Sequence, residues 1–177
     1  MTTPLDPQQR QLVEALIRNE WPKLERFFRT KVPSEHIGEL AQATFLTYVE
    51  NAARATSPRA FLWGIARLQV LKHWERHRTR GAQPFDSTRH SLLDVGPTLS
   101  SAVDRRNRLV RALQALPADQ QMAIELRHGE ELSLEEAASA MEVSLATFKR
   151  YLAAAEERLA VELGPEAPEV VRAYRAS

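Results

Sequence analysis

Residues 133–152 read SLEEAASAMEVSLATFKRYL, and this stretch decides the fold of the C-terminal half of the chain. Ser133 followed by Glu136 is a capping-box pattern, which predicts a short alanine-rich helix over 134–141. Ser144 is a second N-cap residue and predicts that a longer helix begins directly after it. Two capped helices separated by a tight turn have the spacing of a helix-turn-helix, whose second helix can enter the major groove of DNA.

The longer of these helices, expected to end before residue 164, has an apolar face and a polar face. The apolar positions that predict its core-facing side are Phe148, Leu152, Ala155 and Leu159. The side chains left available to DNA are Thr147, Lys149, Arg150 and Tyr151. Acidic residues outnumber Lys and Arg between residues 116 and 163, so this half alone is expected to bind DNA weakly. The alternative is an ordinary helical hairpin, because the turn commonly carries glycine, whereas Glu142 stands here.

Helical signals continue upstream of this motif as far as Asp104. Apolar residues recur at helical spacing up to Leu116, and Pro117 stands in the first turn of a further helix that stops at Gly129. The preceding residues 79–103, TRGAQPFDSTRHSLLDVGPTLSSAV, lose this periodicity and collect Gly, Pro, Ser, Thr and Asp, as an interdomain linker does. A domain boundary is therefore expected in this stretch.

The N-terminal part, from about residue 7 to residue 80, also shows the period of an α-helix. Residues 37–49 place their apolar side chains on one face and leave Glu39 and Gln42 on the other. Pro22 indicates that a helix begins near it, so the residues before 30 form either two helices or one broken helix. Together these patterns predict a first helical domain.

Residues 71–80, LKHWERHRTR, fall in a third helix of this domain, predicted from Pro58 to Arg78 with Ser57 as its N-cap. They allow three interpretations: a metal site, a solvated charged face, or a nucleic-acid surface. His73 and His77 share a helix face, but the HWERH spacing is not that of a metalloprotease motif and no third ligand follows. No metal site is therefore expected.

The nucleic-acid interpretation rests on charge and on aromatic rings. Basic side chains outnumber acidic ones from residue 59 to residue 80 and would attract a phosphate backbone. A helix stripe carrying Trp63 and Trp74 is expected to point away from Ile65 and Leu68, which would offer rings for stacking on unpaired bases. The alternative is that one tryptophan packs into the core and the arginines are solvated. The candidate contact residues are Trp63, Arg67, Lys72, His73, Trp74 and Arg76.

The fold class expected from these patterns is all-α, with two small helical domains joined by a flexible linker. No strand alternation and no internal repeat interrupts the helical pattern. We expect a first domain over residues 1–80, a linker over 81–103, a second domain over 104–163 and a tail over 164–177. The tail is either a short helix or loose.

Composition excludes several classes of function. The chain has no cysteine, which excludes disulfides, thiolate metal sites and cysteine nucleophiles and agrees with a reducing, cytoplasmic compartment. No apolar run is long enough to cross a bilayer, so neither secretion nor membrane insertion is expected. Neither a catalytic Ser, His and acid constellation nor a phosphate loop can be assembled, so we expect a protein without enzymatic activity and without a cofactor.

In their order and spacing, three stretches resemble the extracytoplasmic-function (ECF) group of bacterial sigma-70 factors, the small two-domain sigma factors of RNA polymerase. They are GELAQATFLTYVEN at 38–51, RAFLWGIARLQVLKHWERHRTR at 59–80 and LPADQQMAIELRHGEELSLEEAASAMEVSLATFKRYLAAAEERL at 116–159. The resemblance covers most of residues 8–162. It implies that the first domain, sigma region 2, binds core polymerase and melts the promoter. It also implies that the second domain, region 4, binds the polymerase flap and the upstream promoter element.

The resemblance also assigns roles to positions. The residues that it implies for docking core polymerase are Glu39, Leu40, Gln42, Phe45 and Tyr48. It places the reading and melting of the minus-ten element on the loop 51–57 and the helix after it, with the candidates named above, and minus-thirty-five recognition on Thr147, Lys149, Arg150 and Tyr151. The implied partners are core RNA polymerase, promoter DNA and an anti-sigma factor, and the free protein is expected to be a monomer.

Departures from the family pattern bear on specificity. The chain carries Leu68 where the family usually has Asn and Lys72 where it usually has an acidic residue, so the promoter sequence cannot be taken from a relative. Two other functions stay open at this point. One is a dimeric helix-turn-helix regulator that binds duplex DNA without polymerase. The other is a degenerate sigma that titrates polymerase or an anti-sigma partner without initiating transcription.

Overall fold

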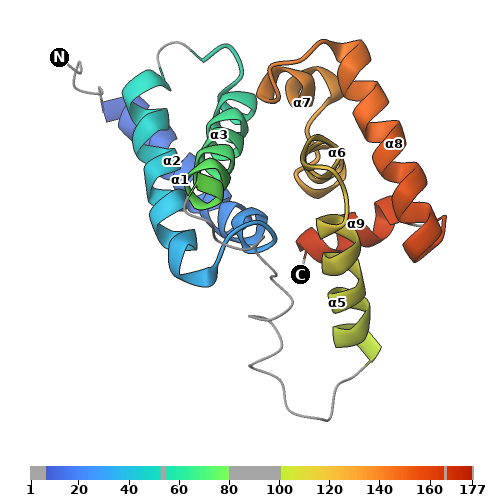
Figure 1. Ribbon diagram of the computed structural model, residues 1–177. Helices are drawn as coiled ribbons and strands as arrows, with labels where there is room; N and C mark the ends of the chain where they lie inside the picture. Colours follow the sequence, from blue (N-terminus) through green and yellow to red (C-terminus); the bar gives the residue numbers. More distant parts are fainter. Residues whose placement is uncertain (1–6, 53–54, 80–100, 166, 177) are drawn as a thin grey trace.

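The computed structural model of the protein describes residues 7–52, 55–79, 101–165 and 167–176, and all regular structure in these ranges is helical (Figure 1). This confirms the all-α fold class. The predicted linker lies mostly outside the described residues. No helix within the described ranges is both long enough and apolar enough to span a membrane.

The first helical group consists of α1 (Pro7–Arg29), α2 (Ser34–Asn51) and α3 (Pro58–Thr79). Pro22 lies inside α1, so the residues before 30 form one helix and the alternative of two helices is wrong. Trp21 on α1 stacks on Phe45 of α2 at a centroid distance of 5.6 Å, which fixes these two helices face to face. Ser57 caps α3, because its Oγ accepts a hydrogen bond from the Ala60 backbone N–H at 3.4 Å.

The second helical group begins with α5 (Ser101–Gln114), which starts three residues before the expected Asp104. It continues with α6 (Ala118–Ile124), the π-helical turn η2 (Glu125–Gly129), α7 (Leu134–Ala140) and α8 (Leu145–Leu163). Pro117 is the N-cap residue of α6 rather than a residue of its first turn. The boundaries of α7 and α8 agree with the prediction made from their caps.

The C-terminal tail forms a helix, α9 (Ala167–Ala176), which decides between the two alternatives for this segment. Ala167 and Val171 are completely buried, because α9 packs on η2, α8 and α5. The tail is therefore part of the second helical group.

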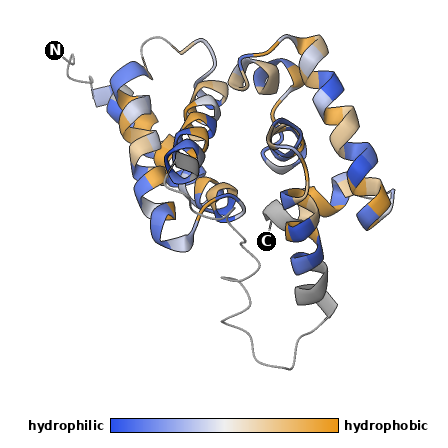
Figure 2. Ribbon diagram, in the orientation of Figure 1, coloured by the Kyte–Doolittle hydropathy of each residue, from blue (hydrophilic) through white to orange (hydrophobic). Residues whose placement is uncertain are grey.

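The two groups lie side by side, with α3 of the first group against α7 of the second (Figure 1). Buried apolar side chains form one continuous cluster that includes residues of both groups. Figure 2 shows hydrophobic residues along the middle turns of α3, and its buried positions include Leu62, Ile65, Ala66 and Val70. α3 is thus covered on two sides, by its own bundle and by the second group.

Candidate nucleic-acid interface

The first helix of the helix-turn-helix, α7, begins with the predicted capping box. Ser133 Oγ accepts from the Glu136 backbone N–H at 3.0 Å, and Glu136 Oε2 accepts from the Ser133 backbone N–H at 2.9 Å. The hydrogen bond from the Ser133 backbone is the main cause that lowers the pKa of Glu136. The prediction of the cap is confirmed, and the two side chains together satisfy two backbone N–H donors at the helix start, one each.

The turn between α7 and α8 contains a strained residue. Glu142 has φ 56°, in the left-handed region that glycine adopts without cost. The turn closes through Val143 N–H, which donates to the Ala138 carbonyl at 3.1 Å. Ser144 then caps α8, since its Oγ accepts from Thr147 N–H at 3.1 Å. The turn therefore keeps the geometry of the motif although its sequence lacks glycine, which disfavours the ordinary hairpin.

α8 presents its two faces as the sequence predicts. The four apolar residues expected in the core are buried, which confirms that side of the prediction: Phe148, Leu152, Ala155 and Leu159. On the other side, Lys149 and Arg150 are exposed, while Thr147 and Tyr151 are half-buried. The start of α8 thus offers two cations and two hydroxyl groups near the surface, a set that can contact phosphates and base edges.

Trp63 on α3 does not lie where the sequence pattern placed it. Its side chain is completely buried and meets the Phe27 ring edge-on at 5.2 Å. Val70, seven residues further along the helix and so on the same face as Trp63, is also buried, whereas Leu68 is 38% exposed. Trp63 and Val70 therefore face the core, as Ile65 does on another side of α3, and the prediction that Trp63 offers its ring to a base is wrong.

The remaining candidates on α3 divide by exposure. Lys72 and Arg76 are exposed, and Arg67 is half-buried with an Nε that has no hydrogen-bond partner among the described residues. Trp74 is half-buried, and its Nε1 donates to the Lys31 carbonyl at 2.9 Å. Arg67, Lys72 and Arg76 thus give this helix a positively charged side, and Trp74 adds part of an indole ring to it.

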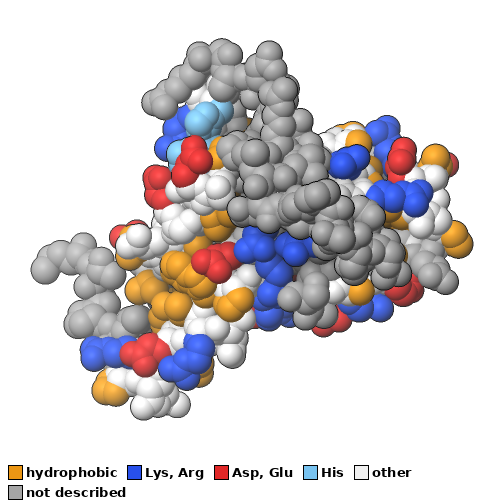
Figure 3. Space-filling model, turned by 90° about the horizontal axis from the view of Figure 1, so that it is seen from below, with side chains coloured by type: hydrophobic (Ala, Val, Ile, Leu, Met, Phe, Trp, Pro, Cys, Tyr) orange, Lys and Arg blue, Asp and Glu red, His pale blue; other side chains and the backbone are white. Residues whose placement is uncertain are grey.

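His73 belongs to a cluster of three imidazole rings that the sequence pattern did not predict. Its ring lies 4.1 Å from that of His77 and 5.0 Å from that of His36 on α2, between ring centroids. Burial lowers the pKa of His73 to about 4, assisted by the charges of His77, His36 and Arg76 and opposed by Glu39. Figure 3 shows histidine side chains gathered on one face beside acidic and basic groups. Among the described residues, no group of three or more His, Cys, Asp or Glu side chains is arranged to hold a metal ion.

On α2 the candidate docking residues fall on opposite sides of the helix. Glu39 and Gln42 are exposed. Leu40, Phe45 and Tyr48 are buried at 2%, 4% and 5% exposure, and burial raises the pKa of the Tyr48 phenol. These three buried residues can affect the docking surface only by supporting its exposed residues from the core side.

Leu46 is a surface residue that the sequence analysis missed. Its side chain is 57% exposed, and its spacing of four and seven residues from Gln42 and Glu39 puts all three on one face of α2. An exposed leucine between polar residues suits a protein contact better than a nucleic acid. A period analysis would have found it as the one apolar residue on the polar face.

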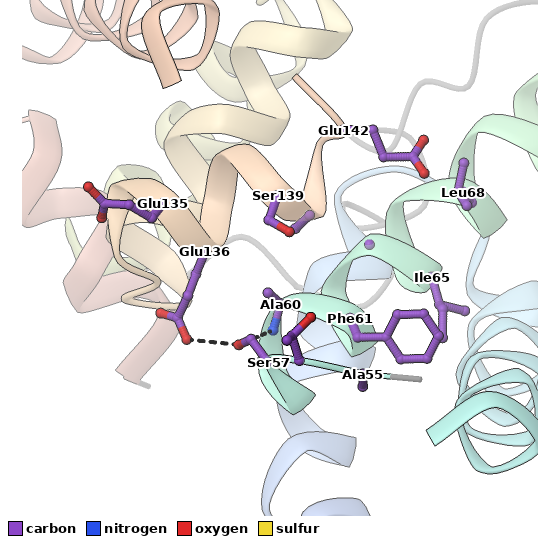
Figure 4. A pocket seen from close by; sticks show the side chains of 13 residues that line it. Ala55, Ser57, Ala60, Phe61, Ile65, Leu68, Glu135, Glu136, Ser139 and Glu142 are labelled. Atoms are coloured by element: carbon purple, nitrogen blue, oxygen red, sulfur yellow. Dashed lines mark hydrogen bonds between the residues drawn. The ribbon is translucent and has the colours of Figure 1, made fainter. Parts of the chain in front are cut away.

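Between α3 and α7 lies a cleft of about 340 Å³. Its α3 side is apolar, with Phe61, Ile65 and Leu68, while Glu135, Glu136 and Glu142 line it from the opposite group (Figure 4). Ser57 Oγ donates to Glu136 Oε1 at 3.2 Å across this boundary. The end of the predicted melting loop is therefore in contact with the helix-turn-helix.

A buried ion pair also joins the two groups, and no local sequence pattern indicates it. The Lys31 Nζ lies 2.5 Å from Glu125 Oε2, and both side chains are completely enclosed. The two residues are 94 positions apart in the chain. Only the tertiary structure brings them together.

A helix-turn-helix with an exposed basic start of its second helix, attached to a separate helical bundle, defines a class of helical DNA-binding proteins. A family profile described as "Sigma-70, region 4" matches residues 106–159. The RNA polymerase sigma factor HrpL of Pseudomonas syringae pv. syringae is 22% identical over 173 residues, which cover 93% of this chain and 94% of HrpL.

Two solved structures share the fold. The sigma factor RpoE, in a complex with the anti-sigma factor NepR from Bartonella quintana, has a TM-score of 0.62 at 21% identity, over 85% of this chain and 95% of RpoE. CnrH, solved with the cytosolic domain of CnrY, has a TM-score of 0.61 at 17% identity, over 86% of this chain and 87% of CnrH. Residues 106–159 thus match region 4 of the sigma-70 family, and most of the chain is similar in sequence to HrpL and in fold to RpoE and CnrH.

Proposed function

We propose that this protein binds core RNA polymerase in the cytoplasm and directs initiation at promoters that it recognises through both helical groups. The observation that supports the proposal is the exposed basic start of α8, which follows two capped helix starts with the order of a helix-turn-helix. The family consists of transcription factors rather than enzymes, and the proposal requires no cofactor. In chain order, residues 1–80 serve as region 2, 81–103 as the linker and 104–163 as region 4.

Docking to polymerase is assigned to the exposed face of α2. Glu39 and Gln42 supply polar contacts, and Leu46 between them supplies apolar area. Leu40, Phe45 and Tyr48 hold this face in place from the core. A surface of this kind complements a basic, partly apolar helical partner.

The minus-ten element is assigned to the 51–57 loop and α3. Arg67, Lys72 and Arg76 are positioned to contact the backbone of a separated strand, and Trp74 offers the exposed part of its ring. Unstacking a base step costs a few kcal/mol, so contacts made only with the melted strand have to offset that cost. His73 is buried and is therefore assigned a packing role below the α3 surface rather than a contact with DNA.

The minus-thirty-five element is assigned to Thr147, Lys149, Arg150 and Tyr151 at the start of α8. Only two of these residues are cationic, and Glu142 precedes them in the turn. This electrostatic footprint supports tight binding only within the holoenzyme, where polymerase supplies the other contacts.

An anti-sigma factor is the proposed regulatory partner, and the free protein is proposed to be a monomer. RpoE was solved with such a partner, and its likeness to this chain extends over both helical groups. Capture of the sigma factor by a protein that covers its polymerase-docking face would withhold it from transcription.

The test is in vitro transcription by purified bacterial core polymerase on a library of promoter fragments, with and without this protein. Run-off transcripts that appear only with the protein support the proposal, and their upstream sequences give the two promoter elements. Polymerase binding without transcripts would instead support a titrating, degenerate sigma. Promoter fragments bound as palindromic sites in the absence of polymerase would support a stand-alone regulator.

A further inference from the structure

Leu68 is a large apolar side chain on the surface of α3. Among the described residues four large hydrophobic side chains are exposed, and Leu68, at 38%, is the one that lies on this helix. Figure 4 shows it among the residues that line the cleft between α3 and α7. A single exposed leucine is common on protein surfaces, so its neighbours decide whether it has a function.

The neighbours of Leu68 on the helix surface are cationic and apolar. Lys72 follows four residues later and Arg76 four residues after that, and both are exposed. Leu71 is half-buried and extends the apolar surface. Side chains four positions apart on a helix lie about 5–6 Å from each other between Cβ atoms. Since the proposed function assigns Lys72 and Arg76 to the DNA backbone, Leu68 lies within one helical turn of a phosphate contact.

Charge restricts the side from which DNA can approach Leu68. On the α7 side the cleft is lined by three carboxylates, among them Glu142, which would repel phosphates. On α3 itself Glu75 is the single acidic residue, and Lys72 and Arg76 flank it in the sequence. Approach along the C-terminal half of α3 is therefore favoured over approach through the cleft.

A leucine can distinguish bases by one chemical feature. Its side chain neither donates nor accepts hydrogen bonds, so a polar base edge turned toward it loses the hydrogen bonds that it makes with water. The 5-methyl group of thymine is apolar and makes no such bonds, and contact with it is a known means of reading thymine. Leu68 is therefore suited to favour thymine over cytosine.

We propose that Leu68 is a specificity-determining residue of the minus-ten surface, which contacts the 5-methyl group of one thymine while Lys72 holds a neighbouring phosphate. The inference rests on the proposed function and deepens it, because it names the base feature that α3 selects. Phosphate contacts position a strand without reading its sequence. Leu68 adds the sequence information that Lys72 and Arg76 cannot supply.

The test uses holoenzyme reconstituted from core polymerase and the full chain, with a forked fragment of a promoter selected by in vitro transcription. Each thymine in the unpaired minus-ten strand is replaced in turn by deoxyuridine, which removes only the 5-methyl group. We expect one position at which the dissociation constant rises about fourfold, the effect of losing one buried methyl group. A strand without thymine, or without a responding position, would overturn the proposal.

Variants of Leu68 decide whether this residue makes the contact. Leu68→Ala should bind the thymine fragment about fourfold or more weakly, with no further loss on deoxyuridine replacement. Leu68→Met keeps an apolar side chain of similar volume and should retain the response to the methyl group. Val161→Ala, at a residue that is 83% exposed on α8, controls for the loss of a surface aliphatic group and should bind as the parent does. Circular dichroism checks that each variant is folded.

A response to deoxyuridine that is equal in the parent protein and in Leu68→Ala would assign the methyl contact to another residue and overturn the proposal. A second change in the DNA separates the methyl group from the rest of the base. When the responding thymine is replaced by 5-methylcytosine, the parent should bind about fourfold more tightly than with cytosine at that position. Leu68→Ala should bind these two fragments equally. Equal binding of both by the parent would also contradict the proposal.

Failure of this inference differs from failure of the proposed function. If the holoenzyme prefers the promoter fragment to a scrambled sequence but shows no methyl effect that depends on Leu68, only the role of Leu68 fails. If the holoenzyme shows no preference for the promoter fragment, the proposed function fails, and the role of Leu68 fails with it.

Discussion

Trp74 on α3 donates its indole N–H to the backbone carbonyl of Lys31 at 2.9 Å, and so ties the late turns of α3 to the end of α1. The residue predicted to stack on DNA therefore has a structural task. Trp74→Phe keeps an aromatic ring but removes the donor, so the Lys31 carbonyl loses its partner. We expect the free energy of unfolding to fall by about 1–3 kcal/mol, measured by urea denaturation.

Trp74→Phe also separates the structural role of Trp74 from a role in stacking on DNA bases. If the exposed part of the ring stacks on a base, Trp74→Phe should retain most of the binding to a forked promoter fragment within the holoenzyme, whereas Trp74→Leu should lose it. Equal binding by both variants would restrict Trp74 to its structural role.

The lowered pKa of His73 leads us to expect that the protein loses stability in mild acid. Its pKa in the folded protein is about 4, below the value of 6.5 for an unperturbed imidazole. Between these two values the unfolded chain binds more protons than the folded one, so stability falls as pH falls from about 6.5 to about 4. The slope from this group is at most about 1.4 kcal/mol per pH unit. Urea denaturation at a series of pH values measures it.

A matched pair of variants isolates this contribution. His73→Leu has a similar volume and no titratable group, so the slope between pH 6.5 and 4 should decrease. His128→Gln changes a histidine of the second helical group, which pairs with Glu156 at 2.8 Å, and should keep the His73 part of the slope. An unaltered slope in His73→Leu would contradict the assignment.

The positive φ of Glu142 leads us to expect that glycine at this position stabilises the protein. Its φ of 56° is unfavourable for a residue with a Cβ atom. Glu142→Gly should raise the free energy of unfolding by up to about 1 kcal/mol, although part of the gain is cancelled by the entropy of glycine in the unfolded chain. Glu142→Ala keeps the Cβ atom and should show no such gain in thermal denaturation. If alanine stabilises as much as glycine, the carboxylate rather than the backbone is the cause.

The start of α8 predicts a specific salt dependence. Removing one phosphate contact should reduce the slope of log K against log salt by about 1. We expect this for holoenzyme binding to promoter DNA with Lys149→Ala or Arg150→Ala. Arg158→Ala removes an equally exposed cation further along the same helix and should leave the slope unchanged. Equal effects at all three positions would indicate only a general loss of charge.

The exposure of Leu46 leads us to expect that its substitution weakens polymerase binding without lowering the stability of the fold. Leu46→Asp should weaken binding to core polymerase about tenfold or more, because a central apolar contact becomes charged. Its effect on unfolding should stay within about 0.5 kcal/mol, as is usual for surface positions. Val161→Asp, at a residue that is 83% exposed on α8, is the control for adding a surface charge. Unchanged affinity in Leu46→Asp would remove this residue from the docking face.

Local signals in the sequence predicted much of this fold. Ser133, Glu136 and Ser144 gave the starts of two helices because capping depends on residues only three positions apart. The core side of α8 followed from one clear period. These features require no knowledge of the partner helices.

Other features could not be predicted from local patterns. α3 is apolar on more than one side, so its period did not distinguish the Trp63 stripe from the surface, and the contact with Phe27 decided it. The Lys31–Glu125 pair and the His36 contact to α3 depend on how helices pack.

The packing of α9 affects how a shortened form of the protein would behave. The family profile ends at residue 159, and a truncation guided by it would remove Ala167 and Val171 from the apolar interior. The exposed surfaces of η2, α8 and α5 would then be open to self-association. Recombinant versions intended for crystallisation or labelling should therefore keep the last helix and carry any affinity tag beyond it.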